Sequence, residues 1–340
     1  MSAQIIRGNA LALPLADASV DLVVTSPPYF ALRSYQDGGE HYAGQLGGEA
    51  TPQEFVDALI AATAEMVRVL KSSGSIWVNL GDKYAGNSNG TGAHRALSRV
   101  GGGQARAVEG APTKSLIGIP WRYALRCIDD LGLILRAEVI WSKPNGLPES
   151  VTDRVRRSHE TWFHFTKEPR YFSAVDEVRE PHAPWTLKAY AYEQANNYAR
   201  RTNRDRVDGG NAKDYAIANP LGKLPGSVWT IATQPLTVPA SLGVDHFAAF
   251  PMEWPRRIIR GWSPADGVVL DPFGGTGTTV LVASALGRHG ISVDMSADYC
   301  RLATWRCNDP SERAKAMQVD KPPADDHGTD DLLSLIGAAS

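Results

Sequence analysis

A strand, a glycine turn, a helix and a second strand follow one another in GVVLDPFGGTGTTVLVASALGRHGISVD, residues 267–294. The apolar runs at 267–271 and 289–294 have the length and branched side chains of strands, and the stretch between them is typical of a helix. Two consecutive strands joined through a helix lie parallel in one sheet. This unit therefore restricts the chain to the α/β class.

The preceding part of the chain repeats this alternation of short β-rich runs and helical stretches. The first of three helices is predicted to begin at Thr51, where Thr-Pro-Gln-Glu forms a capping box, and to stop at Gly74. The other two are expected to end at Gly132 and Gly287. Further strands are expected at residues 20–25, 74–80, 133–141 and 160–167.

The bulk composition narrows the class of protein. With 340 residues, 43% of them hydrophobic and 21% charged, the chain can bury the core of one large domain or of two ordinary ones. It contains no apolar run of membrane-spanning length, so a cytoplasmic protein is expected. Its three cysteines lack C-x-x-C spacing, so neither a disulfide framework nor a metal site is expected.

Charge is distributed unevenly along the chain. Residues 309–340 hold seven acids against three bases and are predicted to be a disordered tail. Residues 185–225 hold seven bases against four acids, which suits either a solvated loop or contact with nucleic acid. The stretch 86–110 is rich in glycine, lacks periodicity and is expected to be a mobile loop.

The glycine turn predicts a cofactor that contains a nucleoside. Glycines let the backbone approach a ligand, and an acid that ends the next strand, Asp294, suits a ribose diol. A phosphate-binding P-loop would need a lysine after Gly277, where Thr278 and Thr279 follow. A dinucleotide fold would want a third glycine where Val280 stands. A tight turn without any ligand stays open as the alternative.

The second chemical feature is TSPPYF at the end of the strand 20–25. Two consecutive prolines cannot continue a sheet or form a helix, so residues 26–29 leave the strand as a stiff arm with fixed carbonyl directions. Taken alone, this tetrapeptide suits a rigid surface turn better than a catalytic site.

Together, TSPPY in one half and DPFGGTG in the other resemble the S-adenosylmethionine-dependent DNA amino-methyltransferases, in the permuted class where the proline motif comes first. The resemblance covers residues 5–308 and includes LKSSGSIWVNLGDKY, LRAEVIWSKPN, PESVTDRVRRSHE, SVWTIATQP and HFAAFP. It implies a Rossmann-like class I methyltransferase sheet with helices on both faces and a small irregular target-recognition insertion. The implied segments are a catalytic half (1–172), a target-recognition segment (173–226) and a donor-binding half (227–308).

The chemistry of amino methylation explains the proline motif. An exocyclic amino nitrogen is a poor nucleophile until acceptors take its hydrogens, and the Ser26 hydroxyl and the Pro27 carbonyl are suitable acceptors. Pro28 keeps them aimed, and Tyr29 offers a face on which a flipped base stacks. Methylation of cytosine carbon 5 would require a Pro-Cys pair, which the chain lacks.

The resemblance also implies how S-adenosylmethionine is held. Phe273 and the glycines would lie along the donor, Asp294 would bind its ribose, and Phe247 and Pro251 would close over its methionine end. Asn9 stands where the family usually has aspartate. The full set of expected donor-site residues is Asn9, Thr25, Phe247, Pro251, Asp271, Pro272, Phe273, Gly274, Gly275, Thr276, Gly277, Thr278 and Asp294.

Double-stranded DNA is the implied partner. A cognate restriction endonuclease and a homodimer are left open, and no membrane partner is expected. A serine in the proline motif favours N4 of cytosine, with N6 of adenine as the alternative; a non-catalytic DNA-binding protein and a dehydrogenase are more remote. The arginines expected to contact DNA are Arg154, Arg156, Arg157, Arg200, Arg201, Arg204 and Arg206.

Overall fold

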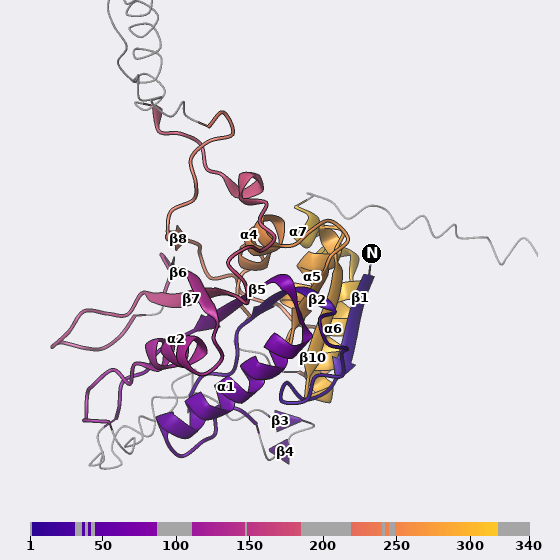
Figure 1. Cartoon of the computed structure of the whole chain (residues 1–340). Coiled ribbons are helices and arrows are strands. Elements are labelled where there is room, and N and C mark those ends of the chain that lie inside the picture. The colour runs from indigo at the N-terminus through magenta and orange to yellow at the C-terminus, as the bar shows by residue number, and fades with distance from the viewer. Residues whose placement is uncertain are drawn as a thin grey trace, which may run out of the picture.

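A mixed sheet of eight strands organises the part of the chain that the structure, a computed structural model, describes (Figure 1). That part comprises residues 2–30, 36–37, 40–41, 45–86, 111–146, 148–184, 219–239, 242–244 and 249–318. The strand order is β1-β10-β9-β2-β5-β7-β6-β8. Its strands are β1 (Ser2–Arg7), β2 (Val20–Thr25), β5 (Leu70–Leu80), β6 (Ile134–Ser142), β7 (His159–Thr166), β8 (Val228–Thr230), β9 (Val268–Asp271) and β10 (His289–Asp294).

Helices cover both faces of this sheet, as the α/β class requires. The helices of the described residues are α1 (Pro52–Val69), α2 (Ile119–Asp129), α4 (Glu253–Trp262), α5 (Thr278–Ala285), α6 (Ala297–Asn308) and α7 (Pro310–Met317). A 3₁₀ turn, η2 (Val175–Val178), and a short hairpin of β3 (Gln36–Asp37) and β4 (Glu40–His41) complete the description. The α/β class and all six expected strands are confirmed, with ends shifted by a few residues.

Strand β2 joins the two halves of the chain. It pairs in parallel with β5 on one side and with β9 on the other, where Leu22 lies opposite Val269. Parallel strands place their carboxyl ends at the same edge of the sheet. The residues that follow β2 and β9 therefore meet, although about 250 residues separate them in sequence.

Helix α1 starts as expected and ends earlier. The Thr51 hydroxyl accepts from the Glu54 N–H (3.2 Å), and the Glu54 carboxylate accepts from the Thr51 N–H (3.0 Å). The prediction that the helix continues to Gly74 is wrong, because Leu70 already pairs with Val20 in β5. The ladder then shifts register, and a Cβ at Gly74 would lie 2.8 Å from the Asp21 carbonyl oxygen. Gly74 thus fits a bulge in the strand.

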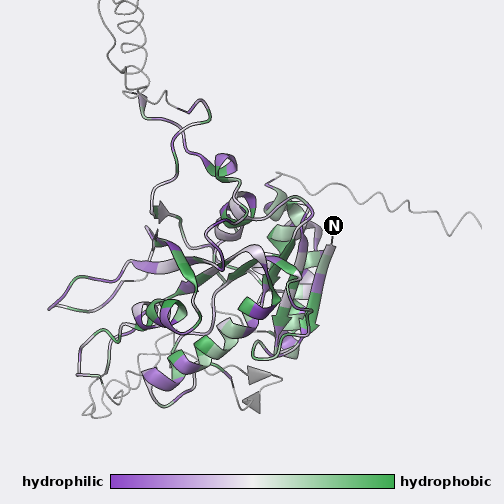
Figure 2. Cartoon of the chain, in the orientation of Figure 1, coloured by the Kyte–Doolittle hydropathy of each residue, from purple (hydrophilic) through white to green (hydrophobic). Residues whose placement is uncertain are grey.

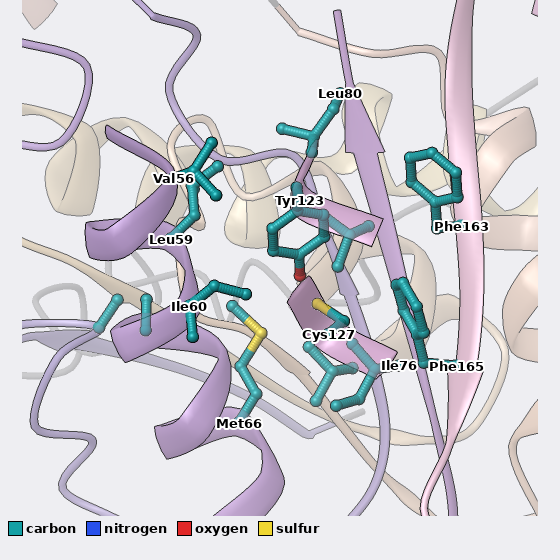
Figure 3. Close-up of a cluster of buried hydrophobic side chains, with 14 of the residues drawn as sticks. Val56, Leu59, Ile60, Met66, Ile76, Leu80, Tyr123, Cys127, Phe163 and Phe165 are labelled. Carbon is teal, nitrogen blue, oxygen red and sulfur yellow. The ribbon is translucent and has the colours of Figure 1, made fainter. Parts of the chain in front are cut away.

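Successive side chains of a strand point to opposite faces of the sheet, so the strands contribute to two separate hydrophobic cores. Ile76 and Phe165 pack with residues of α1 and α2 (Figure 3), and Val23 belongs to the same cluster. Leu22 and Trp77 belong to the core on the opposite face, where α4 and α5 lie. The hydropathy colouring shows the central strands as largely hydrophobic (Figure 2). Both faces of the sheet are therefore buried, as expected of a mainly parallel sheet.

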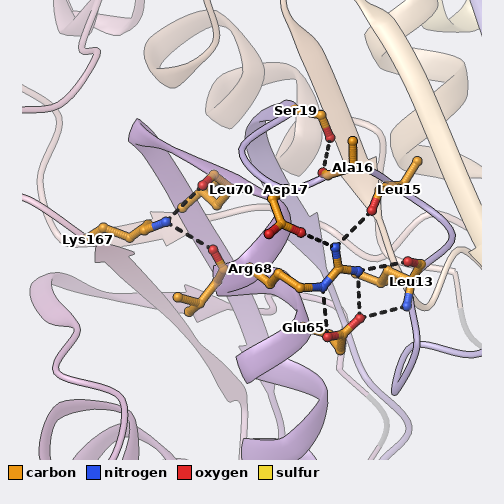
Figure 4. A network of polar contacts seen from close by, with 10 residues as sticks. Leu13, Leu15, Ala16, Asp17, Ser19, Glu65, Arg68, Leu70 and Lys167 are labelled. Carbon is orange, nitrogen blue, oxygen red and sulfur yellow. Dashed lines mark hydrogen bonds and ion pairs between the residues drawn. The ribbon is translucent and has the colours of Figure 1, made fainter.

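A cation fixes the connection between β1 and β2 to the end of α1 (Figure 4). The Arg68 guanidinium donates to the carbonyl oxygens of Leu13 (2.9 Å) and Leu15 (2.9 Å) and pairs with Glu65 and Asp17. Hydrogen bonds to a planar guanidinium fix direction as well as distance. These contacts tie residues 13–17, which lead into β2, to the last turn of α1.

The chain beyond residue 309 begins with helix α7, so the prediction of a disordered tail is wrong for residues 310–317. The Asp309 carboxylate caps this helix by accepting from the Glu312 N–H (2.9 Å). Glu312 is buried and pairs with Arg306 of α6, which ties the helix to the domain. Residues 319–340 lie outside the described part. Within the described ranges, no helix is long and apolar enough to cross a membrane.

Candidate active site

A cavity of about 820 Å³ opens at the carboxyl edge of the sheet. Residues from both halves of the chain line it: Ser26, Pro27 and Tyr29 after β2, and Phe273, Gly274, Gly275, Thr276 and Thr278 after β9. The structure therefore brings the proline motif and most of the glycine turn into one space. Its volume suits a ligand of nucleoside size together with a base.

Glycine shapes the seat of the Tyr29 ring. A Cβ at Gly81, just beyond β5, would lie 2.6 Å from Tyr29 Cε2, so only glycine lets the ring rest against this backbone. The Tyr29 hydroxyl donates to Glu160 Oε2 of β7 (2.7 Å). The Tyr29 ring thus packs against Gly81, its hydroxyl is fixed by Glu160, and the side chain lines the cavity.

Asn79 of β5 links the serine and the tyrosine of the motif. Its amide satisfies its neighbours when the oxygen accepts from Trp162 Nε1 (3.2 Å) and the nitrogen faces Tyr29 Oη (2.7 Å), Glu160 Oε2 (3.0 Å) and Ser26 Oγ (3.3 Å). Two amide hydrogens serve these three acceptors, and Ser26 Oγ is the farthest. The Ser26 hydroxyl therefore keeps lone-pair capacity for a substrate hydrogen.

A buried ion pair completes this network. Lys143, just after β6, pairs with Glu160 Oε1, and its ammonium lies 4.2 Å from the centre of the Trp141 ring. Both charged side chains are more than four-fifths buried. The pair and its hydrogen bonds compensate the cost of removing two charges from water, and together they fix Glu160 against Tyr29. Glu160, Lys143 and Trp141 all line the cavity.

The three turn glycines are required for different reasons. A Cβ at Gly274 would lie 1.8 Å from Ser292 Oγ, and one at Gly277 would lie 2.7 Å from Ala303 Cβ, so these two allow close packing. Gly275 has φ +49° and nothing nearer to its missing Cβ than 3.8 Å. Its backbone is therefore open toward the cavity, as a site for a closely bound nucleoside requires.

Arg306 of α6 holds the glycine turn through hydrogen bonds to Thr276 and Thr278. Its buried guanidinium donates to the Thr276 carbonyl (3.1 Å) and to the hydroxyls of Thr276 (3.1 Å) and Thr278 (2.9 Å). Its Nε donates to Glu312 of α7 (2.9 Å). Sequence reasoning found neither residue, because both lie after the last motif, and Glu312 lies in the segment predicted to be disordered.

Asp271 lies beneath the turn and does not line the cavity, being 2% exposed. Its carboxylate accepts from the hydroxyls of Thr25 (2.6 Å) and Thr279 (2.8 Å) and from the Phe273 N–H (3.1 Å). Burial raises the pKa of Asp271 to about 6, against the lowering effect of these hydrogen bonds. The geometry gives Asp271 and Thr25 the task of supporting the turn.

Asp294 contacts the glycine turn directly. Its carboxylate accepts from the Gly275 N–H (2.9 Å) and from the Ser296 N–H (2.9 Å), although it does not line the cavity. Asn9 is exposed, and its side chain accepts from the Leu11 N–H (3.0 Å). The other expected residues that do not line the cavity are Pro28, Pro251, Pro272 and Gly277. Phe247 lies outside the described residues.

The arginines expected to contact DNA divide into three groups. Arg157 lines the cavity, and its Nη1 lies 3.8 Å from Asp82. Arg154 and Arg156 instead make contacts within the loop between β6 and β7. Arg200, Arg201, Arg204 and Arg206 lie outside the described part of the chain, as do residues 87–110 of the glycine-rich stretch.

Sequence reasoning missed the residues that surround the motif. Asn79, Lys143 and Glu160 lie within the sequence blocks that carry the family resemblance, but the resemblance assigns them no role. A polar Asn79 inside the otherwise apolar run SIWVNL was a usable signal. For Lys143 the signal was its position just after the carboxyl end of an expected strand, where ligand sites of parallel sheets form. Glu160 begins its strand and gave no such signal.

Comparison with known proteins agrees with this geometry. A family model for N6/N4 methyltransferases, described as DNA methylase, matches residues 20–304. Type II methyltransferase M.XycI of Xanthomonas campestris pv. cyanopsidis is 35% identical, covering 88% of this chain and 86% of that protein. M.SmaI of Serratia marcescens is 33% identical and covers 90% of each.

Among solved structures, PvuII DNA methyltransferase (cytosine-N4-specific) superposes with a TM-score of 0.60 at 22% identity, covering 94% of this chain and 92% of that one. A putative DNA modification methylase of Thermus thermophilus gives 0.52 at 22% identity, covering 93% and 96%. These likenesses confirm the methyltransferase fold. The chain belongs to the S-adenosylmethionine-dependent DNA amino-methyltransferases, the N6/N4 family of DNA methylases.

Proposed function

We propose that this chain methylates N4 of a cytosine flipped out of double-stranded DNA, by direct transfer from S-adenosylmethionine. The observation that carries the proposal is the shared cavity, in which Ser26 and Tyr29 face the glycine turn. A nucleophile held by one group and a methyl donor held by the other would meet there without a covalent enzyme intermediate. None of the three cysteines lines this cavity.

The glycine turn suits the donor. S-adenosylmethionine supplies, when bound, a sulfonium methyl group that is already activated for transfer. We assign its contacts to Phe273, Gly274, Gly275, Thr276 and Thr278, and its ribose to Asp294, which already touches the turn. Phe247 and Pro251 are proposed for its methionine end and Asn9 for its adenine edge. Support of the turn falls to Thr25, Asp271, Pro272 and Gly277.

The proline motif prepares the nucleophile. The Ser26 hydroxyl and the Pro27 carbonyl would accept the two amino hydrogens, which frees the nitrogen lone pair for attack. Proline cannot donate a competing N–H, and Pro28 removes a second one. Tyr29, fixed by Gly81 and Glu160, would stack on the flipped base.

Two features favour cytosine over adenine. Cytosine carries a carbonyl oxygen, O2, which adenine lacks, and the cavity holds two cationic donors, Lys143 and Arg157, that suit such an acceptor. The second feature is the likeness of fold to PvuII methyltransferase, which is described as cytosine-N4-specific.

Recognition of the target is assigned to the middle of the chain. We propose that residues 173–226 form a target-recognition segment between a catalytic half (1–172) and a donor half (227–308). Its basic residues Arg200, Arg201, Arg204 and Arg206 would contact phosphates. The Type II designation of the relatives supports a cognate restriction endonuclease as the functional counterpart.

Nucleoside mass spectrometry tests this proposal. Plasmid DNA is recovered from methylation-free cells that express the chain, and from matched cells that express the Ser26→Ala variant. N4-methylcytosine in the first sample and not in the second is the expected result. N6-methyladenine would overturn the choice of base, and the absence of both modifications would overturn the proposed activity on this DNA.

A further inference from the structure

The loop between β6 and β7 forms one wall of the cavity and projects beyond the sheet (Figure 1). Its described residues are 143–146 and 148–158. Those that line the cavity are Lys143, Asn145, Gly146, Pro148, Glu149, Arg157 and Ser158. A DNA duplex that delivers a flipped base into the cavity must therefore approach this loop.

Side chains brace the loop. The Arg154 guanidinium donates to Glu149 (2.7 Å) and to the Val155 carbonyl (3.0 Å), and it lies 3.7 Å from the centre of the Tyr84 ring. Arg156 donates across the loop to the Gly146 carbonyl (3.1 Å). Two arginines expected to reach DNA thus hold the loop in shape, so little conformational entropy remains to be lost when the loop meets a partner.

An apolar side chain stands on this braced loop. Val155 is 85% exposed, the highest value among the large hydrophobic residues of the described chain. Arg157, two residues further on, lines the cavity, and two residues of extended chain span at most about 7 Å. In the free protein this isopropyl group is left largely in water, from which transfer into an apolar environment is favourable.

The neighbouring cation has an unused donor. Arg157 Nη1 is buried and makes no hydrogen bond to any described residue, and the Asp82 carboxylate is 3.8 Å away. The Asp82 carboxylate is too far away to accept a hydrogen bond from this nitrogen, so the charge of Arg157 is only loosely paired at the wall of the cavity. The loop therefore carries an exposed apolar side chain, Val155, and two residues further on a cation that lines the cavity.

We propose that Val155 is the wedge that enters the base stack of the duplex and fills the gap left by the flipped base. This inference rests on the proposed function. Flipping costs a few kcal/mol in lost stacking and pairing, and an apolar side chain that replaces the base recovers part of that cost. Arginines beside the wedge offset the charge of the phosphates that approach it.

The test compares Val155→Ala with wild type on two short duplexes that carry the mapped methylation site. In one the target base is paired, and in the other its partner is replaced by an abasic site, which makes flipping easier. We expect the variant to methylate the paired duplex about 10-fold more slowly, since two methyl groups are lost from the wedge, and the unpaired duplex at nearly the wild-type rate. Leu125→Ala, an exposed leucine on α2, is the matched control and should leave both rates unchanged.

Each outcome decides the matter. Equal slowing on both duplexes, or no slowing on either, would overturn the proposed role of Val155. Binding of S-adenosylmethionine, measured by calorimetry, verifies that the variant is folded. Failure of the proposed function is detected beforehand and separately, because plasmid DNA would then carry no methylated base and no site could be mapped. A methylated adenine would change the base and leave this comparison valid.

Discussion

The hydrogen bond between Tyr29 and Glu160 predicts a measurable coupling between the two side chains. Tyr29→Phe removes the hydroxyl that donates to Glu160 Oε2 at 2.7 Å. Glu160→Gln keeps the size of the acceptor but removes its charge and leaves Lys143 without its carboxylate partner. If Glu160 acts by holding the tyrosine ring, the double variant should be little worse than the more damaged single variant.

The magnitude follows from the type of bond. A hydrogen bond to a charged group in a mostly buried site contributes about 1.5 to 3 kcal/mol, which corresponds to about 10- to 150-fold in rate. Tyr29→Phe should lower kcat by an amount within this range, because the ring then loses its fixed orientation. Donor affinity should stay unchanged, because neither residue belongs to the glycine turn.

Single-turnover methylation with saturating DNA and donor measures the effect on the transfer step. A fluorescent base analogue at the target position reports separately whether the base still flips. Tyr171→Phe is the matched control, since that hydroxyl contacts Arg136, and neither residue lines the cavity. Additive losses, with a coupling below about 0.5 kcal/mol, would refute the idea that Glu160 works through Tyr29.

Three further predictions concern the serine, the ribose contact and the buried acid. Ser26→Ala should lower turnover strongly at unchanged donor affinity, and wild-type turnover would remove Ser26 from the mechanism. Asp294→Ala should weaken donor binding in calorimetry by about 1.5 to 3 kcal/mol, and unchanged affinity would count against the ribose assignment. Because burial raises the pKa of Asp271 from 3.8 to about 6, the folded state binds this proton more tightly than the unfolded state, and about 3 kcal/mol of stability present at low pH is lost as pH rises through 6. Denaturant unfolding should therefore show Asp271→Asn gaining on wild type between about pH 4 and pH 8, and a difference independent of pH would contradict the assignment.

Most of the sheet was predictable, because short apolar runs rich in branched side chains mark strands that are buried on both faces. The strands that sequence reasoning missed lack this signal. β1 is a largely exposed edge strand with the mixed sequence SAQIIR, and β8 has only three residues. The helix that follows Asp309 was missed because the acidic composition of residues 309–340 is typical of a disordered tail. Its stability depends on the cap formed by Asp309 and on the buried pair between Glu312 and Arg306, which composition does not reveal.

The candidate site was predictable where it consists of motif residues at strand ends. Ser26, Tyr29 and the glycine turn required only that their strands lie parallel and adjacent. Glu160 required more, because β7 runs antiparallel to β5 and the register of Leu80 against Thr161 decides what lies beside Tyr29. Sequence could not supply that register, nor could the charge of Arg154 show that it pairs with Glu149 of its own loop and lies over the Tyr84 ring.

The pairing of β1 with β10 and of β2 with β9 has a consequence for synthesis of the protein. During synthesis β1 must wait for β10 and β2 must wait for β9, because in each case the intervening chain is more than 240 residues long. Contacts of such long range form late. A translation product that stops before residue 268 therefore carries the proline motif on a strand with one open edge and lacks the glycine turn, so we expect it to aggregate rather than to act as half an enzyme.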